Sequence, residues 1–175
     1  MRLWIFLAII NEMKNNALTL LAMLLMMSAY SQSLDEKYCK DVKSIDAIIN
    51  AYYDVISGAS TDPWQFERDK YLHSQDALII HVDENGKIVK NSLEAEYIPF
   101  LLSDKESFYE VEIDRIVNKY GNMAQVWSTY EIRNEPDVAS DIRGQNSIQL
   151  YFSEGRWWIS GWTTQLESKK HPIPE

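Results

Sequence analysis

The stretch YFSEGRWWISGWTTQ, residues 151–165, contains the features that decide the fold. A Glu-Gly pair marks a tight turn between two runs of alternating apolar residues, which is the pattern of a β-hairpin. Three tryptophans follow the turn within six positions. Because side chains alternate along a strand, we expect Trp157 on one face and Trp158 and Trp162 on the other. The last strand therefore carries a large aromatic ring on each face of a sheet.

Strand patterns dominate the C-terminal half of the chain. Alternating apolar residues occur in segments 108–120, 124–132, 145–152 and 156–165, and turn residues such as Gly121 separate these segments. Strands that are joined by short turns pair in antiparallel fashion. The four segments therefore predict one continuous antiparallel sheet.

The N-terminal half has a helical period instead. Isoleucines and tyrosines recur every three or four positions after Ser44, which is suited to cap a helix. Pro63 is expected to open a second helix, and Asn91 with Glu94 resembles the capping box of a third. The predicted order is helix 45–56, helix 63–72, strand 77–82, strand 87–90, helix 93–102 and the four long strands. This order predicts an α+β fold in which a strongly curved antiparallel sheet wraps around the N-terminal helices and leaves a cavity at its open end.

The N-terminal segment resembles an export signal. A short positive stretch begins at Met13, a mostly apolar run follows it, and small residues occupy the two positions that a signal peptidase recognises. We predict a signal peptide over residues 1–31, with the true start at Met13 and cleavage before Gln32. The mature protein would then be secreted or periplasmic. The alternative is a longer, uncleaved anchor that also uses residues 3–10.

The mature chain has the length of a single domain. We assign residues 32–43 to an N-terminal extension, 44–168 to the folded domain and 169–175 to a C-terminal tail. The whole chain has a formal net charge of −9 at pH 7, which argues against nucleic acid and anionic membrane surfaces as partners. After signal cleavage we therefore expect no membrane association. Cys39 is the only cysteine, so an intrachain disulfide cannot form.

Four segments resemble the SnoaL-like branch of the nuclear transport factor 2-like superfamily. They are IINAYYDVISG (48–58), DPWQFERDKYLHSQDALIIH (62–81), GNMAQVWSTYEIR (121–133) and GQNSIQLYFSEGRWWISGW (144–162). The resemblance implies a cone-shaped α+β fold of the nuclear transport factor 2-like or cystatin-like type. It also implies a deep apolar pocket and a homodimer that packs through the outer face of the sheet. It implies no single reaction, because members with unrelated activities share these segments.

Two residues are candidates for catalysis. In the ketosteroid isomerase branch, the segment after the second helix ends in an aspartate that acts as general base, and His81 occupies the matching position. A neutral imidazole in an apolar pocket can accept a proton near pH 7. The same enzymes place a tyrosine of the first helix at the developing oxyanion, and Tyr52 lies one position from that match. Alternatively, His81 ends a buried strand with its nitrogens bonded to backbone or water, and Tyr52 packs in the core.

Other residues are assigned to the pocket or to an interface. The pocket is expected to be lined by Tyr52, Trp64, His81, Val126, Tyr130 and Trp157. An exposed aromatic patch at the dimer interface is expected to contain Trp127, Trp158 and Trp162. A bulge near Gly161 would instead turn Trp162 into the pocket. His73, Asp76 and His81 match no zinc pattern, so neither a metal nor another cofactor is expected.

Two functions of different classes are consistent with these features. The first is an exported protein whose apolar pocket holds a small hydrophobic molecule. The second is a lyase or isomerase, such as a dehydratase or a ketosteroid isomerase-like enzyme, with His81 as general base and Tyr52 polarising a carbonyl group. We favour the first, because no complete acid–base pair stands at matching positions. Export also argues against an enzyme of polyketide or steroid biosynthesis, because the intermediates of these pathways are usually cytoplasmic.

Overall fold

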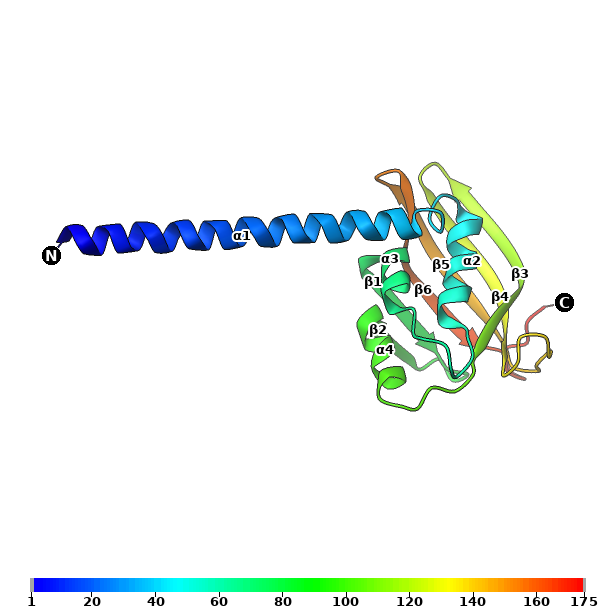
Figure 1. The fold of residues 1–175 in the computed structure, drawn as a ribbon. Coiled ribbons are helices and arrows are strands. Elements are labelled where there is room, and N and C mark those ends of the chain that lie inside the picture. The colour runs from blue at the N-terminus through cyan, green and yellow to red at the C-terminus, as the bar shows by residue number, and fades with distance from the viewer. Residues whose placement is uncertain (1, 175) are drawn as a thin grey trace. The chain divides into compact units, whose positions relative to one another are not determined.

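The computed structural model describes residues 2–174, apart from the side chains of residues 2–12, 33 and 34. It contains two compact units that divide after Cys39. The first unit is built on one helix, α1 (Arg2–Tyr38), and the remaining helices and strands belong to the second unit (Figure 1). These are α2 (Ile45–Ile56), α3 (Phe66–Leu72), β1 (His73–Val82), β2 (Ile88–Ser92), α4 (Leu93–Leu101), β3 (Tyr109–Tyr120), β4 (Met123–Arg133), β5 (Arg143–Ser153) and β6 (Arg156–Leu166).

Helix α1 continues through the predicted cleavage site before Gln32. From Met13 to Tyr38 it is long and apolar enough to cross a membrane, judged by length and composition alone. Its side chains from Met13 to Gln32 are exposed. An apolar helix near the N-terminus is compatible with the predicted signal sequence, although an uncleaved anchor has the same properties.

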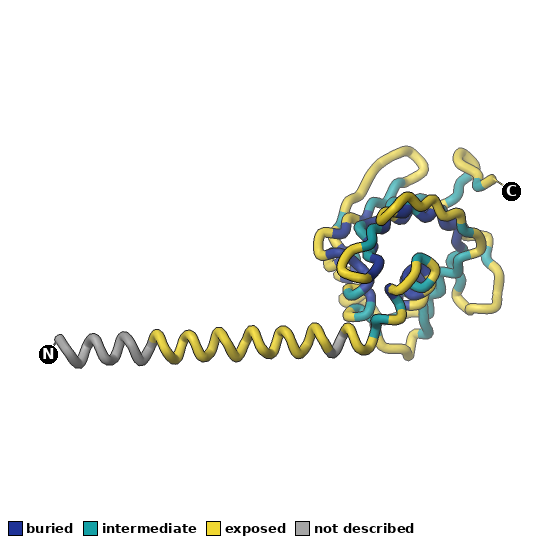
Figure 2. Tube along the Cα trace, turned by 90° about the horizontal axis from the view of Figure 1, so that it is seen from above, coloured by how far each residue is buried: buried dark blue, intermediate teal, exposed yellow. Residues whose placement is uncertain are grey.

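The six strands of the second unit form one sheet in the order β2-β1-β6-β5-β4-β3. The sheet curls around α2 without closing, and β2 and β3 are its two edges (Figures 1 and 2). This confirms the predicted α+β fold with a strongly curved sheet. Neighbouring strands are antiparallel, with the exception of β1 and β6, which run parallel. The sequence pattern did not reveal this pair, because turn residues identify only strands that follow each other in the chain.

Helix α2 supplies the centre of the core. As predicted, Ser44 caps it, and the Ser44 Oγ accepts a hydrogen bond of 3.0 Å from the backbone N–H of Ala47. The buried stripe of α2 packs on the concave face of the sheet, and Figure 2 shows the buried residues on the inner side of the curve. The central core residues are Ile48, Ile49, Tyr52, Val55, Val126, Ile148, Leu150, Trp157 and Ile159.

Three element boundaries differ from the predictions. Helix α3 begins at Phe66, so Pro63 lies in the loop before it and not at its first position. Strand β1 begins earlier than expected, because His73 already pairs with β6 across an irregularity. Helix α4 is capped by Ser92 and not by Asn91, whose side-chain amide instead donates a hydrogen bond to Glu96.

Candidate functional site

A cavity of about 1070 Å³ lies on the concave side of the sheet, next to α2 and α4. Four of the predicted pocket residues line it, namely Tyr52, Trp64, His81 and Tyr130. The other two, Val126 and Trp157, are not part of its wall. Both are buried in the core with α2, because the inner face of the sheet extends beyond the cavity and is there filled by side chains. An inward-facing position is therefore not sufficient to place a residue in the cavity.

Trp162 also lines the cavity, which corrects its expected place on the outer face. The centre of its ring lies 5.2 Å from the ring centre of Tyr52. The cause is a bulge at Ser160 and Gly161, where the register of β6 against β5 shifts by one residue. Gly161 has a φ of 149°, and a Cβ at this position would collide with the backbone of Leu78 in β1. The bulge reverses the alternation of side chains and turns Trp162 inward.

The two other tryptophans of the predicted interface, Trp127 and Trp158, do not line the cavity. Trp127 is exposed on β4, opposite Ile116 of β3. Trp158 is half-buried and stacks on Tyr151, with the two ring planes 14° apart. The guanidinium carbon of Arg156 lies 3.7 Å from the centre of the Trp158 ring. The role of Trp127 and Trp158 in an interface stays a prediction.

His81 is engaged by a carboxylate at the edge of the cavity. Its Nε2 lies 3.0 Å from both carboxylate oxygens of Glu96 on α4. This hydrogen bond raises the pKa of His81, because the Glu96 carboxylate stabilises the imidazolium form. A general base must be neutral before it accepts a proton, and the ion pair with Glu96 works against that requirement. No hydrogen bond or ring contact joins His81 to Tyr52 within the described part of the chain.

Tyr52 brings a hydroxyl group into the cavity. The residue is buried, lines the cavity, and its hydroxyl makes no hydrogen bond with any residue that the structure describes. Burial, followed by the nearby charge of Glu110, raises the pKa of Tyr52. The hydroxyl therefore stays protonated and is available to donate a hydrogen bond to a bound molecule.

Glu110 is the site residue that the sequence pattern did not reveal. It lies on β3 beside Ile132 of β4, and it lines the cavity. Burial raises the pKa of Glu110 to about 7, and both a hydrogen bond from Asn146 and the charge of His81 oppose the increase. A carboxyl group that is half ionised near neutral pH is suited to proton transfer. The apolar residues on either side of Glu110 suggested that their face, and not the face of Glu110, was turned inward.

A network of buried hydrogen bonds fixes the position of the Glu110 carboxylate. The side-chain amide of Asn146 on β5 donates to Glu110 Oε1 at 3.1 Å and to the Tyr53 hydroxyl at 3.2 Å. The Tyr53 hydroxyl lies 2.7 Å from Ser128 Oγ. These groups are buried between α2 and the sheet, so they restrict the positions that the Glu110 carboxylate can take.

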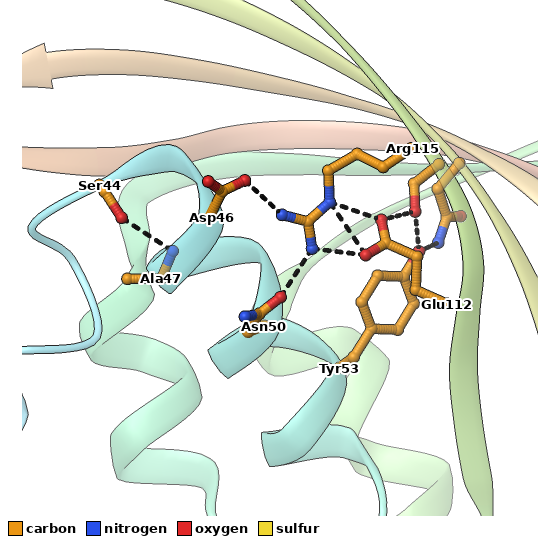
Figure 3. Close-up of polar contacts among 9 residues, drawn as sticks. Ser44, Asp46, Ala47, Asn50, Tyr53, Glu112 and Arg115 are labelled. Atoms are coloured by element: carbon orange, nitrogen blue, oxygen red, sulfur yellow. Dashed lines mark hydrogen bonds and ion pairs between the residues drawn. The ribbon is translucent and has the colours of Figure 1, made fainter.

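The same network continues to an ion pair beneath α2 (Figure 3). Ser128 donates to the carboxylate of Glu112, which also accepts hydrogen bonds from Arg115. The Arg115 guanidinium reaches across to α2, where it donates to Asp46 at 2.8 Å and to Asn50 at 2.7 Å. Arg115 therefore links β3 to α2, and its charge is already used by Glu112 and Asp46.

Comparisons with known proteins agree on the fold. No protein-family model matches the sequence, and no curated protein matches it. A protein of unknown function with a cystatin-like fold from Nostoc punctiforme has a TM-score of 0.55 and 12% identity, over 71% of this chain and 90% of that one. An NTF2-like protein of unknown function from Shewanella baltica has a TM-score of 0.51 and 15% identity, over 70% and 90%. A function-unknown protein from Mycobacterium tuberculosis has a TM-score of 0.52 and 14% identity, over 75% of each chain.

These likenesses show the class of structure. The second unit has the NTF2-like, or cystatin-like, fold that the sequence resemblance implied. At this level of identity the solved structures establish the fold and no particular activity. The function must therefore be argued from the cavity and its residues.

Proposed function

We propose that this chain is an exported binding protein whose cavity holds a small, largely apolar molecule. The cavity of about 1070 Å³ carries this proposal, because its wall includes the aromatic side chains of Tyr52, Trp64, Tyr130 and Trp162. Sites for small molecules are typically concave, of roughly 300–1,000 Å³, and mostly apolar with a few polar groups. Of the polar groups in the wall, we expect Glu110 and the Tyr52 hydroxyl to orient the molecule. The apolar helix α1 supports the export of the chain.

The test uses N-phenylnaphthylamine, a neutral apolar dye whose fluorescence rises in an apolar site. We expect saturable binding to the full chain. Ile132 lines the cavity, so Ile132→Trp fills part of it and should weaken dye binding by about tenfold. Ile116→Trp is the matched control, because Ile116 is exposed on β3 opposite Trp127. A dye that does not bind, or that binds Ile132→Trp as tightly as the unaltered chain, would refute the proposed site.

A specific observation favours a second candidate function in the same cavity. Glu110, with a pKa of about 7, and the unbonded Tyr52 hydroxyl both line it. A carboxylate base together with a hydrogen-bond donor to a carbonyl oxygen is the pair that a lyase or isomerase of the ketosteroid isomerase type requires. In this alternative Glu110 takes the role that the sequence suggested for His81. Proton exchange at the carbon next to the carbonyl of cyclohexanone, followed by NMR in D₂O, should be accelerated by the unaltered chain and not by Glu110→Gln.

A further inference from the structure

The wall of the cavity is strongly acidic. Three of its residues are basic, namely His81, Lys87 and Lys105. Eight carry carboxyl groups, namely Asp69, Asp83, Glu84, Glu96, Asp104, Glu106, Glu110 and Glu167. Four of them, Asp83, Glu84, Asp104 and Glu106, are exposed to solvent and so give the open side of the cavity a negative potential. Such a potential raises the local concentration of cations and lowers that of anions.

Inside the cavity, Glu110 differs from the other carboxylates in its partners. Glu96 is paired with His81. Asp69, which is fully buried, lies 3.2 Å from His73 and accepts a hydrogen bond of 2.9 Å from Tyr97. Glu110 has only the neutral amide of Asn146, and no cation forms an ion pair with it among residues 13–174. Glu110 is thus a carboxylate inside the fold without a counter-charge.

Among the described residues, the groups that face Glu110 from neighbouring elements form no ion pair with it, and His81 acts on it only through its more distant charge. Tyr52 and Tyr53 come from α2 and Tyr130 comes from β4, and the charge of Glu110, after burial, raises the pKa of all three hydroxyls. On its own strand, Arg115 is held by Glu112, and on β1, His81 is held by Glu96. The carboxylate therefore has an amide as its hydrogen-bond partner, and phenol groups are the neighbours on which its charge acts. Aromatic rings attract cations through their negative faces, so this environment is suited to a positive charge.

We propose that the cavity selects organic cations, in which an ammonium group lies against Glu110 and an apolar body lies among Tyr52, Tyr130 and Trp162. This inference rests on the proposed function of the cavity as a binding site and specifies the class of ligand. The ammonium group of the ligand pairs with the Glu110 carboxylate, and the ring surfaces replace part of the hydration of the ammonium group. An anionic molecule of the same shape would meet an unpaired carboxylate inside and an acidic mouth outside.

Binding and protonation are coupled in this arrangement. Because the pKa of Glu110 is about 7, only the ionised fraction of the protein binds the ammonium group well. That fraction falls from roughly nine-tenths at pH 8 to roughly one-tenth at pH 6, so the affinity should fall by about tenfold over this range. At pH 7, binding should also release about half a proton per site, which calorimetry in buffers of different ionisation enthalpy measures.

The experiment compares two molecules of the same shape, phenyltrimethylammonium and tert-butylbenzene, by displacement of N-phenylnaphthylamine from the full chain. We expect the ammonium compound to bind about tenfold more tightly at pH 8 than at pH 6, and Glu110→Gln to weaken it by at least tenfold at pH 8. Binding of tert-butylbenzene should not change with pH or with Glu110→Gln, which also shows that the variant is folded. Asp114→Asn removes an exposed carboxylate on the same strand as Glu110 but outside the cavity wall, so it is the control variant and should change the ammonium affinity by less than threefold.

The outcomes separate the two proposals. Two results would refute the preference for cations and leave the binding function standing. In the first, tert-butylbenzene displaces the dye and the ammonium compound does not. In the second, the ammonium compound binds Glu110→Gln as tightly as the unaltered chain. If neither compound displaces the dye and the dye itself does not bind, both proposals are refuted.

Discussion

At the scale of single residues, Glu110 combines two properties that seldom occur together. Its side chain lines the cavity with only part of its surface exposed, and its hydrogen-bond donor among the described residues, the amide of Asn146, carries no charge. Burial favours the neutral form of an acid, which is the reason that the pKa of Glu110 rises to about 7. The residue therefore resists ionisation in the folded chain and ionises readily in the unfolded chain.

This difference predicts a pH-dependent effect on stability. The pKa of Glu110 is about 7 in the folded chain against an ordinary value of 4.5. Between these values the folded state binds more protons than the unfolded state. The contribution of Glu110 to the free energy of unfolding is therefore fully present below pH 4.5 and is lost as the pH rises through 7. Its upper limit is roughly 3 kcal/mol. We expect the free energy of unfolding of the unaltered chain, minus that of Glu110→Gln, to be lower at pH 8 than at pH 5.

Urea denaturation at the two pH values measures this difference. The other titrating groups, including His81 and Glu96, are present in both proteins and largely cancel in the subtraction. A difference that stays constant between pH 5 and pH 8 would show that the carboxyl group of Glu110 titrates normally in the folded chain.

The sequence could predict those cavity residues for which the residue type and the hydrophobic periodicity both indicate an inward-facing position. Tyr52 belongs to the apolar stripe of a helix, and Tyr130 belongs to the inward face of a strand, so periodicity alone placed both of them. Glu110 could not be found in this way, because a carboxylate next to valine and tyrosine on a strand normally faces solvent. Only the packing of β3 against Asn146 and the helices determines that it faces the cavity.

At the scale of elements, the bulge at Gly161 sets the position of Trp162. A Cβ at this position would collide with the backbone of Leu78, and the φ of 149° is one that other residues rarely adopt. We therefore expect Gly161→Ala to lower the free energy of unfolding by about 3 kcal/mol or more. The change should also alter the fluorescence spectrum of the tryptophans, because Trp162 lies in the strand that must move.

Gly121→Ala is the matched control for this prediction. Gly121 also has a positive φ, of 56°, but a Cβ there meets no atom within 4 Å. Its replacement should cost only about 1 kcal/mol, which is the cost of the backbone conformation alone. Equal costs at Gly121 and Gly161 would mean that the close approach of β1 to β6 does not restrict position 161.

The link between β3 and α2 gives a second prediction at this scale. The Arg115 side chain is largely buried and neutralises Glu112, whose side chain is 15% exposed. Arg115→Met keeps most of the apolar stem of the side chain but removes the guanidinium and leaves the Glu112 carboxylate unpaired, so the free energy of unfolding should fall by roughly 2 kcal/mol. Asp46→Asn changes the exposed end of the same network, where the side chain is 79% exposed, and should cost less than about 0.5 kcal/mol. Chemical denaturation of the two variants checks both values, and a smaller loss for Arg115→Met than for Asp46→Asn would contradict this account.

Most elements were predictable because local sequence and tertiary structure agree. The four long strands and α2 appear within a few residues of their predicted bounds, since turn glycines and period both mark them. The sequence indicates the bulge at Ser160 only as an alternative, because one extra residue in a strand leaves no periodic signal. The start of β1 at His73 is not predictable for a related reason, since its pairing partner lies far along the chain.

At the scale of the whole molecule, the division after Cys39 predicts independent folding. The buried residues of the main core cluster all lie between Val42 and Ile159, within the second unit. We expect a chain that begins at Lys40 to unfold cooperatively, with a Tm within about 2 °C of the full chain. Differential scanning calorimetry measures both. A truncated chain that melts far lower, or without a cooperative transition, would show that α1 contributes to the core.

The parallel pairing of β1 with β6 also has a consequence for biosynthesis. His81 pairs with Thr164, so β1 and β2 cannot join the rest of the sheet until β6, which comes far later in the chain, has been synthesised. Contacts between such distant segments form late, because a long loop must close before they yield any free energy. Until β6 has been made, β1 therefore lacks one of its two neighbours in the sheet. Such a delay would suit the export that we propose, because translocation channels accept chains before they fold.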